Sequence, residues 1–322
     1  MTLTLSPRRS VCLGFWLAVL LPLLAIPVAA QTPGPNDDST LQAAPSGAAV
    51  QTPDEEDDPA ELDPAEPDFV VVNIPTNLRL PRFKSNFRLT HRFNGNLRSG
   101  SFSDNASNLF GLDQGAIIGF EFRINLMRNL QAAAFRTNFD RTIQLYGKYD
   151  AVRQRGAMPV SISGIVSLEG TNNFQEKFAP AVGVVLSRRL GTRLALYAVP
   201  IWVGNTNASL APIEHDHDHE GEVEEHEHEE APGYEKQGTF LVGLGARARL
   251  TPTVYIVGEV TPRVDGYAPG EVEYGFGIEK RVGGHAFALT FTNTFGTTFA
   301  QLARGGNANA LYLGFNLGRK YF

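Results

Sequence analysis

From Phe83 to the end of the chain, hydrophobic and polar residues alternate with a period of two. Phe87, Leu89, His91 and Phe93, for example, are separated by single polar residues. This period is typical of a β-strand whose two faces meet different surroundings. The pattern predicts twelve strands, at about residues 86–93, 116–126, 130–139, 142–152, 159–169, 178–188, 192–203, 238–250, 253–264, 272–281, 285–295 and 311–321.

The connections between these segments alternate in length. Every even-numbered connection is short, as at 127–129 and 190–191, whereas the longest ones, such as 94–113 and 204–237, are odd-numbered. A membrane barrel that begins and ends on one side has this arrangement, with an even strand count, long outer loops and short inner turns. We therefore predict an all-β fold, an antiparallel transmembrane β-barrel of about 12 strands that forms a domain at residues 69–322.

Two N-terminal segments precede the barrel. Residues 1–30 have a basic start, an apolar run of about 14 residues and small residues before Gln31, which predicts a cleaved signal peptide. A membrane anchor is the alternative, but the run is shorter than the ~20 residues that a span needs. Residues 31–68 are rich in Pro, Ala and acidic residues, and predict a disordered linker.

The charge of the chain is unevenly distributed. Of its 34 acidic residues, eleven lie in residues 31–68 and ten in residues 214–230, and neither segment contains Lys or Arg. The barrel body is therefore basic although the formal net charge is −6. The single cysteine, Cys12, excludes an internal disulfide framework.

The C-terminal segment resembles a signal for insertion into the bacterial outer membrane. Apolar residues alternate through it, and the chain ends on an aromatic residue. We expect an assembly signal for the barrel assembly machinery at Phe315, Leu317, Tyr321 and Phe322. Aromatic residues such as Tyr197, Trp202, Tyr255 and Phe287 are expected on the lipid face and in its girdles.

Charged residues occupy the strand faces opposite the apolar rows. On the lipid face each would cost about 2–4 kcal/mol near the midplane, so we expect them to line the lumen. They are Arg88, Arg92, Glu121, Arg123, Lys148, Asp150, Glu169, Arg247, Arg249, Glu259, Arg263, Glu273 and Glu279. Because twelve strands lie between a side-chain-filled barrel and an open channel, a solvated pore and a closed salt-bridge network both remain open.

The longest connection contains five of the seven histidines among ten carboxylates. Imidazole and carboxylate groups bind Zn, Ni or Cu, but this spacing matches no closed metal module. The candidate ligands of a weak, multi-site metal capture are His215, Asp216, His217, Asp218, His219, His226 and His228. An acidic surface loop with incidental histidines is the alternative.

We predict no enzyme activity and no required cofactor. Outside the histidine-rich connection, the chain has only His91 and His285, and neither has a serine nearby in sequence that could act as a nucleophile.

Several short stretches, taken together, resemble an uncharacterised family of bacterial outer-membrane β-barrels, a domain of unknown function numbered 5777. They are Thr90–Phe93, Phe110–Gln114, Met158–Ser161, Gly283–Phe287, Thr290–Thr294 and Gly314–Asn316, spread over residues 85–322. The resemblance implies a barrel in the outer membrane and supplies neither a substrate nor catalytic residues.

Together these features predict a bacterial outer-membrane barrel for passive transport of small polar solutes or cations. The alternative is a non-conducting structural or interaction barrel with a salt-bridged lumen. We expect the partners to be outer-membrane lipid, the assembly machinery and a possible periplasmic partner of the acidic linker, with no nucleic acid. By the parity of the connections, the linker is periplasmic and the histidine-rich loop extracellular.

Overall fold

The computed structural model describes residues 63–208 and 235–321. The described residues all belong to one compact unit. The predicted leader, most of the acidic linker, the histidine-rich connection and Phe322 lie outside the described residues.

The described chain consists mostly of strands. These are β1 (Ser85–Asn96), β2 (Ala116–Met127), β3 (Leu130–Thr137), β4 (Ile143–Val152), β5 (Ser161–Gly170), β6 (Glu176–Leu190), β7 (Leu194–Val203), β8 (Thr239–Arg249), β9 (Val254–Thr261), β10 (Arg263–Gly266), β11 (Glu273–Val282), β12 (His285–Thr292) and β13 (Tyr312–Tyr321). Short helical turns lie in the connections: α2 (Phe102–Ser107), η2 (Leu109–Gln114), η3 (Phe139–Arg141), α3 (Thr171–Phe174) and α4 (Phe299–Ala303).

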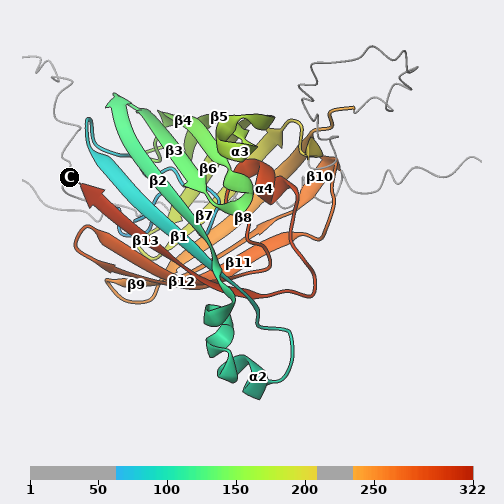
Figure 1. Cartoon of the computed structure of the whole chain (residues 1–322). Coiled ribbons are helices and arrows are strands. Elements are labelled where there is room, and N and C mark those ends of the chain that lie inside the picture. Colours follow the sequence, from blue (N-terminus) through green and yellow to red (C-terminus); the bar gives the residue numbers. More distant parts are fainter. Residues whose placement is uncertain (1–62, 209–234, 322) are drawn as a thin grey trace, which may run out of the picture. The chain divides into compact units, whose positions relative to one another are not determined.

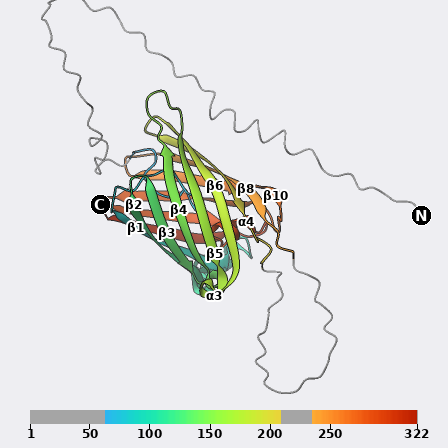
Figure 2. The ribbon, with the colours of Figure 1, turned by 90° about the horizontal axis from the view of Figure 1, so that it is seen from above.

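The strands form one antiparallel sheet that closes on itself. From β1 to β9 each strand pairs with the next one along the chain, and so do β11, β12 and β13. β9 also pairs with β11, and β13 pairs with β1. β10 continues β9 beyond Pro262 and also pairs with β8, so β9 and β10 act as one wall strand. Figures 1 and 2 show the strands side by side around the barrel. The predicted closed, twelve-stranded, all-β barrel is confirmed. Closure gives every strand two hydrogen-bonding neighbours, as hydrocarbon requires.

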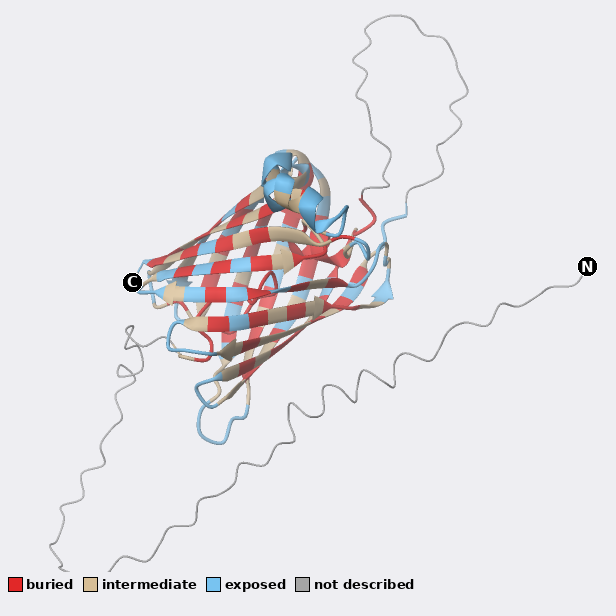
Figure 3. Ribbon diagram, turned by 90° about the horizontal axis from the view of Figure 1, so that it is seen from below, coloured by how far each residue is buried: buried red, intermediate tan, exposed pale blue. Residues whose placement is uncertain are grey.

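Burial alternates along the strands as the sequence pattern requires (Figure 3). In β2, Glu121 and Arg123 are buried, whereas Phe120 and Phe122 are each 49% exposed. The exposed apolar side chains form the lipid face. Two aromatic residues differ from our expectation: Tyr197 and Tyr255 are buried inside the barrel and not on the lipid face. The hydroxyl of Tyr197 lies 3.5 Å from Arg247, which gives this side chain a polar partner in the lumen.

The connections distinguish the two ends of the barrel. The short turns share one end with Ser85 and Tyr321, and we call this the turn end. The connections that contain α2, α3 and α4 form the opposite loop end. In the described ranges, no helix has the length and apolar character needed to cross a membrane.

Candidate functional site

The barrel lumen is occupied by the residues that precede β1. Residues 63–80 form a hairpin that enters from the turn end, and we call them the plug hairpin. Its two legs are joined by a bridge between Val70 and Pro75 and by hydrogen bonds from Thr76 N to the Phe69 carbonyl (3.0 Å) and from Thr76 Oγ1 to the Asp68 carbonyl (2.6 Å). Nearly all its side chains are buried.

This hairpin changes the predicted organisation of the chain. Residues 63–68 were predicted to be the end of a disordered linker, yet Ala65, Glu66 and Asp68 are buried within the barrel unit. Burial against the lumen wall orders them although their composition is polar. The barrel domain, predicted to begin at residue 69, therefore includes at least residues 63–68 as well.

The tip of the plug hairpin is held by one wall carboxylate. The backbone N–H groups of Val72, Asn73 and Ile74 all donate to Glu259 of β9, at 2.8–3.1 Å. Such charge-assisted bonds are stronger than neutral ones. The tip is thus a small anion-binding turn whose anion is a side chain of the wall.

Further wall residues bind the side chain and carbonyl groups at the tip. Arg92 donates to Asn73 Oδ1 at 3.1 Å and to Asn316 Oδ1 at 2.9 Å. Asn316 in turn donates to the Val72 carbonyl at 2.9 Å. Asn73 Nδ2 donates to Glu273 at 3.3 Å. Strands β1, β11 and β13 therefore all contact the tip.

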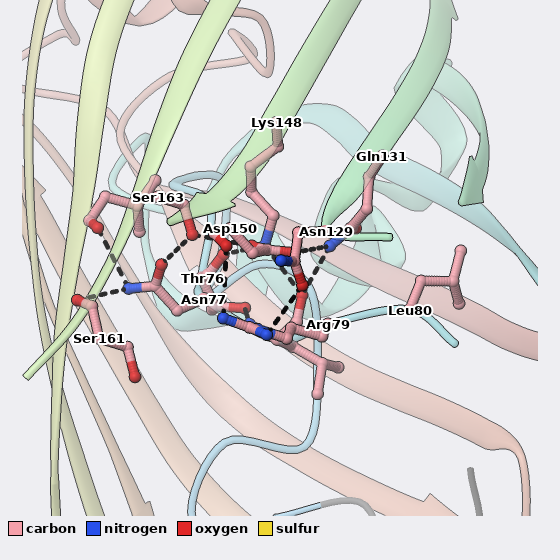
Figure 4. A network of polar contacts seen from close by, with 12 residues as sticks. Thr76, Asn77, Arg79, Leu80, Asn129, Gln131, Lys148, Asp150, Ser161 and Ser163 are labelled. Atoms are coloured by element: carbon pink, nitrogen blue, oxygen red, sulfur yellow. Dashed lines mark hydrogen bonds and ion pairs between the residues drawn. The ribbon is translucent and has the colours of Figure 1, made fainter. Parts of the chain in front are cut away.

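The second leg of the plug hairpin is bound mainly by β4, β5 and β6 (Figure 4). Lys148 Nζ donates to the carbonyl groups of Thr76 and Leu78 at 2.9 and 2.8 Å, and it also pairs with Asp150 at 3.1 Å. The side-chain amide of Asn77 donates to Ser187 Oγ at 3.0 Å. These contacts satisfy buried main-chain groups that a strand ladder would otherwise have to satisfy.

The first leg is bound by cationic side chains of other wall strands. Arg247 donates to the Val70 carbonyl at 2.6 Å and to Glu279 at 2.9 Å. Lys320 pairs with Asp68 at 3.3 Å. The ring of Phe69 has the guanidinium group of Arg123 4.7 Å from its centroid and the ammonium group of Lys320 5.5 Å from it, so cation–π contacts add to the ion pairs.

The pKa values of the two buried carboxyls of the plug hairpin shift in opposite directions. Burial raises the pKa of Glu66, and hydrogen bonding by the Asn77 amide only partly offsets this. Burial also acts to raise the pKa of Asp68, but Lys320 and Arg247 outweigh it and lower that pKa. Acidification therefore strengthens the seating of the hairpin through Glu66 and weakens it through Asp68.

A second segment fills the loop end of the lumen. At the start of α4, Ala300 N and Thr298 Oγ1 donate to Glu169 of β5 at 3.1 and 3.0 Å. Phe299 and Ala300 belong to the same buried apolar cluster as Val72 and Ile74 of the plug hairpin. The lumen is therefore filled from the turn end by the hairpin and from the loop end by α4.

The predicted lumen residues lie mostly at this interface. All of them are buried except Arg249 and Arg263, which are partly exposed. Arg249 contacts the Pro252 carbonyl at a turn, and Arg263 contacts the carbonyl groups of Pro269, Gly270 and Arg304 at the loop end. Ion pairs join Arg88 to Glu121 and Arg123 to Glu121, at 2.8 and 3.1 Å.

The alternation of polar and apolar residues along the strands does not predict that this wall has an internal partner. Three residues outside the predicted lumen set, Lys320, Asn316 and Ser187, also contact the plug hairpin. One signal is present: residues 69–72 form an apolar run that does not alternate and precedes the first strand. A short apolar run bounded by turn residues indicates a buried segment of either type.

The remaining candidates are at the outer face or outside the described residues. His91 stacks on Phe315 with ring centroids 4.8 Å apart, and His285 contacts Arg319 at 2.8 Å. Leu317 and Tyr321 of the expected assembly signal are exposed on the outer face. Among residues 63–208 and 235–321, no three His, Cys, Asp or Glu side chains are grouped to hold a metal.

Comparison with known families identifies this architecture. The family described as a membrane-bound β-barrel domain (DUF5777) matches residues 68–321. The chain belongs to this family. The match begins at Asp68, so residues 68–80 of the plug hairpin, including its tip, lie within the family domain. No curated protein matches the chain.

Several solved structures resemble the chain at low sequence identity. The NanC porin is 7% identical, with a TM-score of 0.44, over 74% of this chain and 99% of the porin. The KdgM porin in complex with disordered oligogalacturonate is 8% identical, with a TM-score of 0.42, over 74% and 98%. Outer membrane phospholipase A from Escherichia coli is 11% identical, with a TM-score of 0.37, over 78% and 95%.

Proposed function

We propose that the protein is a gated barrel of the bacterial outer membrane, which passes small polar solutes passively when its plug hairpin withdraws. The observation that carries this proposal is the plug hairpin itself. A segment continuous with the N-terminal chain occupies the lumen, and the wall around it is charged. Withdrawal would leave a polar conduit, narrowed at the loop end by α4, that water can fill.

The contacts of the plug hairpin suit a removable element. Wall side chains bind its main chain and polar groups, and some of the same side chains also pair with one another, as Arg247 does with Glu279. Buried ion pairs add little net stability, because desolvation opposes their attraction. In an open lumen, water would therefore hydrate the charged side chains of the wall.

The charges of the wall predict a modest selectivity. Buried cations and anions both line it: Lys148 pairs with Asp150, Arg247 pairs with Glu279, and Arg92 and Glu273 both contact Asn73. Because both signs are present, we expect an open lumen to pass small polar solutes of either charge. Selectivity would depend mainly on the size of the solute.

A non-conducting barrel is the second candidate, and one observation favours it. The tip of the plug hairpin and α4 share an apolar cluster, which includes Val72, Ile74 and Phe299. Burial of this apolar surface stabilises the closed lumen by about 25 cal/mol per Å². In that case the hairpin is a permanent part of the barrel core.

Planar-bilayer conductance separates the two functions. We would compare the full chain with a variant in which residues 63–80 are replaced by a Gly/Ser segment of equal length, and with one in which residues 296–306 are also replaced. The full chain should be closed with rare openings, and the hairpin variant should conduct steadily. If both variants retain heat-modifiable gel mobility but show no conductance, transport is rejected.

A lock on the plug hairpin provides the matched control. Asn77 and Ser163 are in hydrogen-bond contact, so Asn77→Cys with Ser163→Cys should allow the hairpin to be cross-linked to β5. Cross-linking should abolish the rare openings and reduction should restore them. Openings that persist unchanged in the cross-linked barrel would show that the hairpin is not the gate.

Metal capture by the histidine-rich loop remains a separate prediction. The candidate ligands His215, His217, His219, His226 and His228 alternate with carboxylates, which favours weak binding of Zn, Ni or Cu. Calorimetric titration of the full protein with each metal tests this. The same heats from a variant with all five histidines changed to Ala would reject the imidazole assignment.

A further inference from the structure

A second candidate site lies at the loop end of the barrel. A cavity of about 500 Å³ opens between the end of β1, the connection that contains α2 and η2, η3, and the start of β13. Its size is within the range of small-molecule sites. Figure 1 shows this connection extending beyond the barrel from the ends of β1 and β2.

The lining of this cavity has a distinctive chemistry. It includes the amide side chains of Asn94, Asn108 and Gln114 and the aromatic rings of Phe139, Phe295 and Tyr312. In the described part of the chain, no Asp, Glu, Lys or Arg lines it. The cavity therefore combines neutral hydrogen-bonding groups with apolar ring surfaces.

The backbone around the cavity is closely fitted. Gly95 of β1 and Gly111 of η2 approach so closely that a Cβ on Gly95 would lie 2.1 Å from the Gly111 Cα. Gly111 also has a φ of +89°, a conformation that favours glycine. A hydrogen bond of 3.0 Å from Asn94 N to the Gly115 carbonyl secures the other end of the loop. The loop is thus fixed over β1 by contacts that leave the cavity open.

The polar groups of the cavity have unused capacity. Asn94 Oδ1 is buried and has no hydrogen-bond partner among the described residues. A buried acceptor without a donor costs about 1–3 kcal/mol, so a ligand that supplied a donor would be favoured. The rings of Phe295 and Tyr312 lie with centroids 3.9 Å apart, and Phe139 meets Phe295 edge-on at 6.5 Å.

We propose that this cavity binds a neutral saccharide. Each amide offers both a donor and an acceptor, which matches the hydroxyl groups of a sugar. The rings offer apolar surface to its C–H face. A phosphate or carboxylate ligand would lack a cation to pair with. The proposal does not depend on whether the lumen conducts.

Neutral saccharides could come from two sources, and the probes should separate them. Free oligosaccharides are represented by maltotriose, cellotriose and mannotriose. Membrane-bound sugar is represented by the neutral sugars of purified lipopolysaccharide, which also carries anionic groups. Trigalacturonate is the acidic comparison. The full barrel should be prepared in an amine-oxide detergent, because detergents with sugar head groups would compete. Saturation-transfer NMR and calorimetry then report binding.

Variants at exposed positions keep the test independent of folding. Asn108→Ala and Gln114→Ala each remove one hydrogen-bonding side chain, and each should weaken binding about fivefold. Phe295→Leu should weaken it further by removing the ring. Gln237→Ala, at an exposed loop-end position that does not line the cavity, is the matched control and should bind like the wild type.

The proposal is supported if a neutral oligosaccharide or lipopolysaccharide binds, and if the three cavity variants weaken this binding while Gln237→Ala does not. The probe that binds then identifies the source of the saccharide. Absence of binding by all three neutral oligosaccharides and by lipopolysaccharide would overturn it. Equal binding by the wild type and the cavity variants, or binding of trigalacturonate alone, would overturn it as well.

Discussion

Single carboxylates hold the two segments that fill the lumen. Glu259 accepts three backbone N–H groups at the tip of the plug hairpin, and Glu169 accepts Ala300 N at the start of α4. Glu259→Ala should therefore speed hydrogen exchange of the Val72, Asn73 and Ile74 amides about ten- to hundredfold, because buried N–H groups lose their acceptor. Mass spectrometry of exchanged peptides measures this.

The same experiment contains its own control. Glu169→Ala should speed exchange at Ala300 and leave the hairpin amides protected. Equal loss of protection in both segments in both variants would show that the lumen contents behave as one unit, and that neither carboxylate has a local role.

Glu66 should make the seating of the plug hairpin dependent on pH. Because burial raises the pKa of Glu66, its ionised form opposes seating, and this opposition is present above the raised pKa. Glu66→Gln keeps an acceptor for Asn77 N and removes the charge. We expect hairpin amides to exchange more slowly in Glu66→Gln than in the wild type at pH 8, with the difference vanishing as pH falls below about 4.

Exchange rates corrected for their intrinsic pH dependence provide the measurement. A constant difference between the two proteins from pH 4 to pH 8 would contradict the role of the Glu66 charge.

Among the elements, the strands were predictable and the plug hairpin was not. A wall strand such as β2 has lipid on one face and the lumen on the other, so Phe120 and Phe122 alternate with Glu121 and Arg123. The local sequence therefore shows this period of two. The plug hairpin is surrounded on all sides, so its burial imposes no period, and its partners lie up to 252 residues away in the sequence.

At the lumen wall, too, the sequence pattern predicts only part of the candidate site. Alternation placed charged residues such as Lys148 and Glu259 on the inner face, because lipid excludes them. It could not show whether water or protein meets them there. Their actual partners are the main-chain groups of Thr76 and Asn73. Every residue type has these main-chain groups, so the amino-acid sequence does not indicate such contacts.

The depth of a strand position should determine the cost of a charge on the lipid face. Val166 lies in the middle of β5 and is 62% exposed, whereas Met127 ends β2 at the turn end and is 54% exposed. Val166→Arg should lower the free energy of unfolding by about 2–4 kcal/mol, and Met127→Arg by about 0–1 kcal/mol. Denaturant titration in lipid vesicles compares them, and equal costs would argue against a membrane centred on β5.

For the whole molecule, the separation of turns from loops predicts a fixed orientation. The short turns share one end with the hairpin opening and Tyr321, and the long connections share the other. Proteins of this topology place their termini and turns in the periplasm. The loop end, with the proposed saccharide cavity, would then face outward, and the plug hairpin would withdraw toward the periplasm.

Two near-isosteric substitutions test this orientation. Ser103 in α2 and Thr253 in the turn before β9 are both exposed, at opposite ends of the barrel. The chain has a single cysteine, Cys12, within the predicted leader, so Ser103→Cys and Thr253→Cys each introduce one thiol into the mature barrel. A membrane-impermeant maleimide should label Ser103→Cys on intact cells, and Thr253→Cys only after the outer membrane is opened. The reverse pattern would place the hairpin opening outside the cell, and the gate would then have to be driven from the external medium.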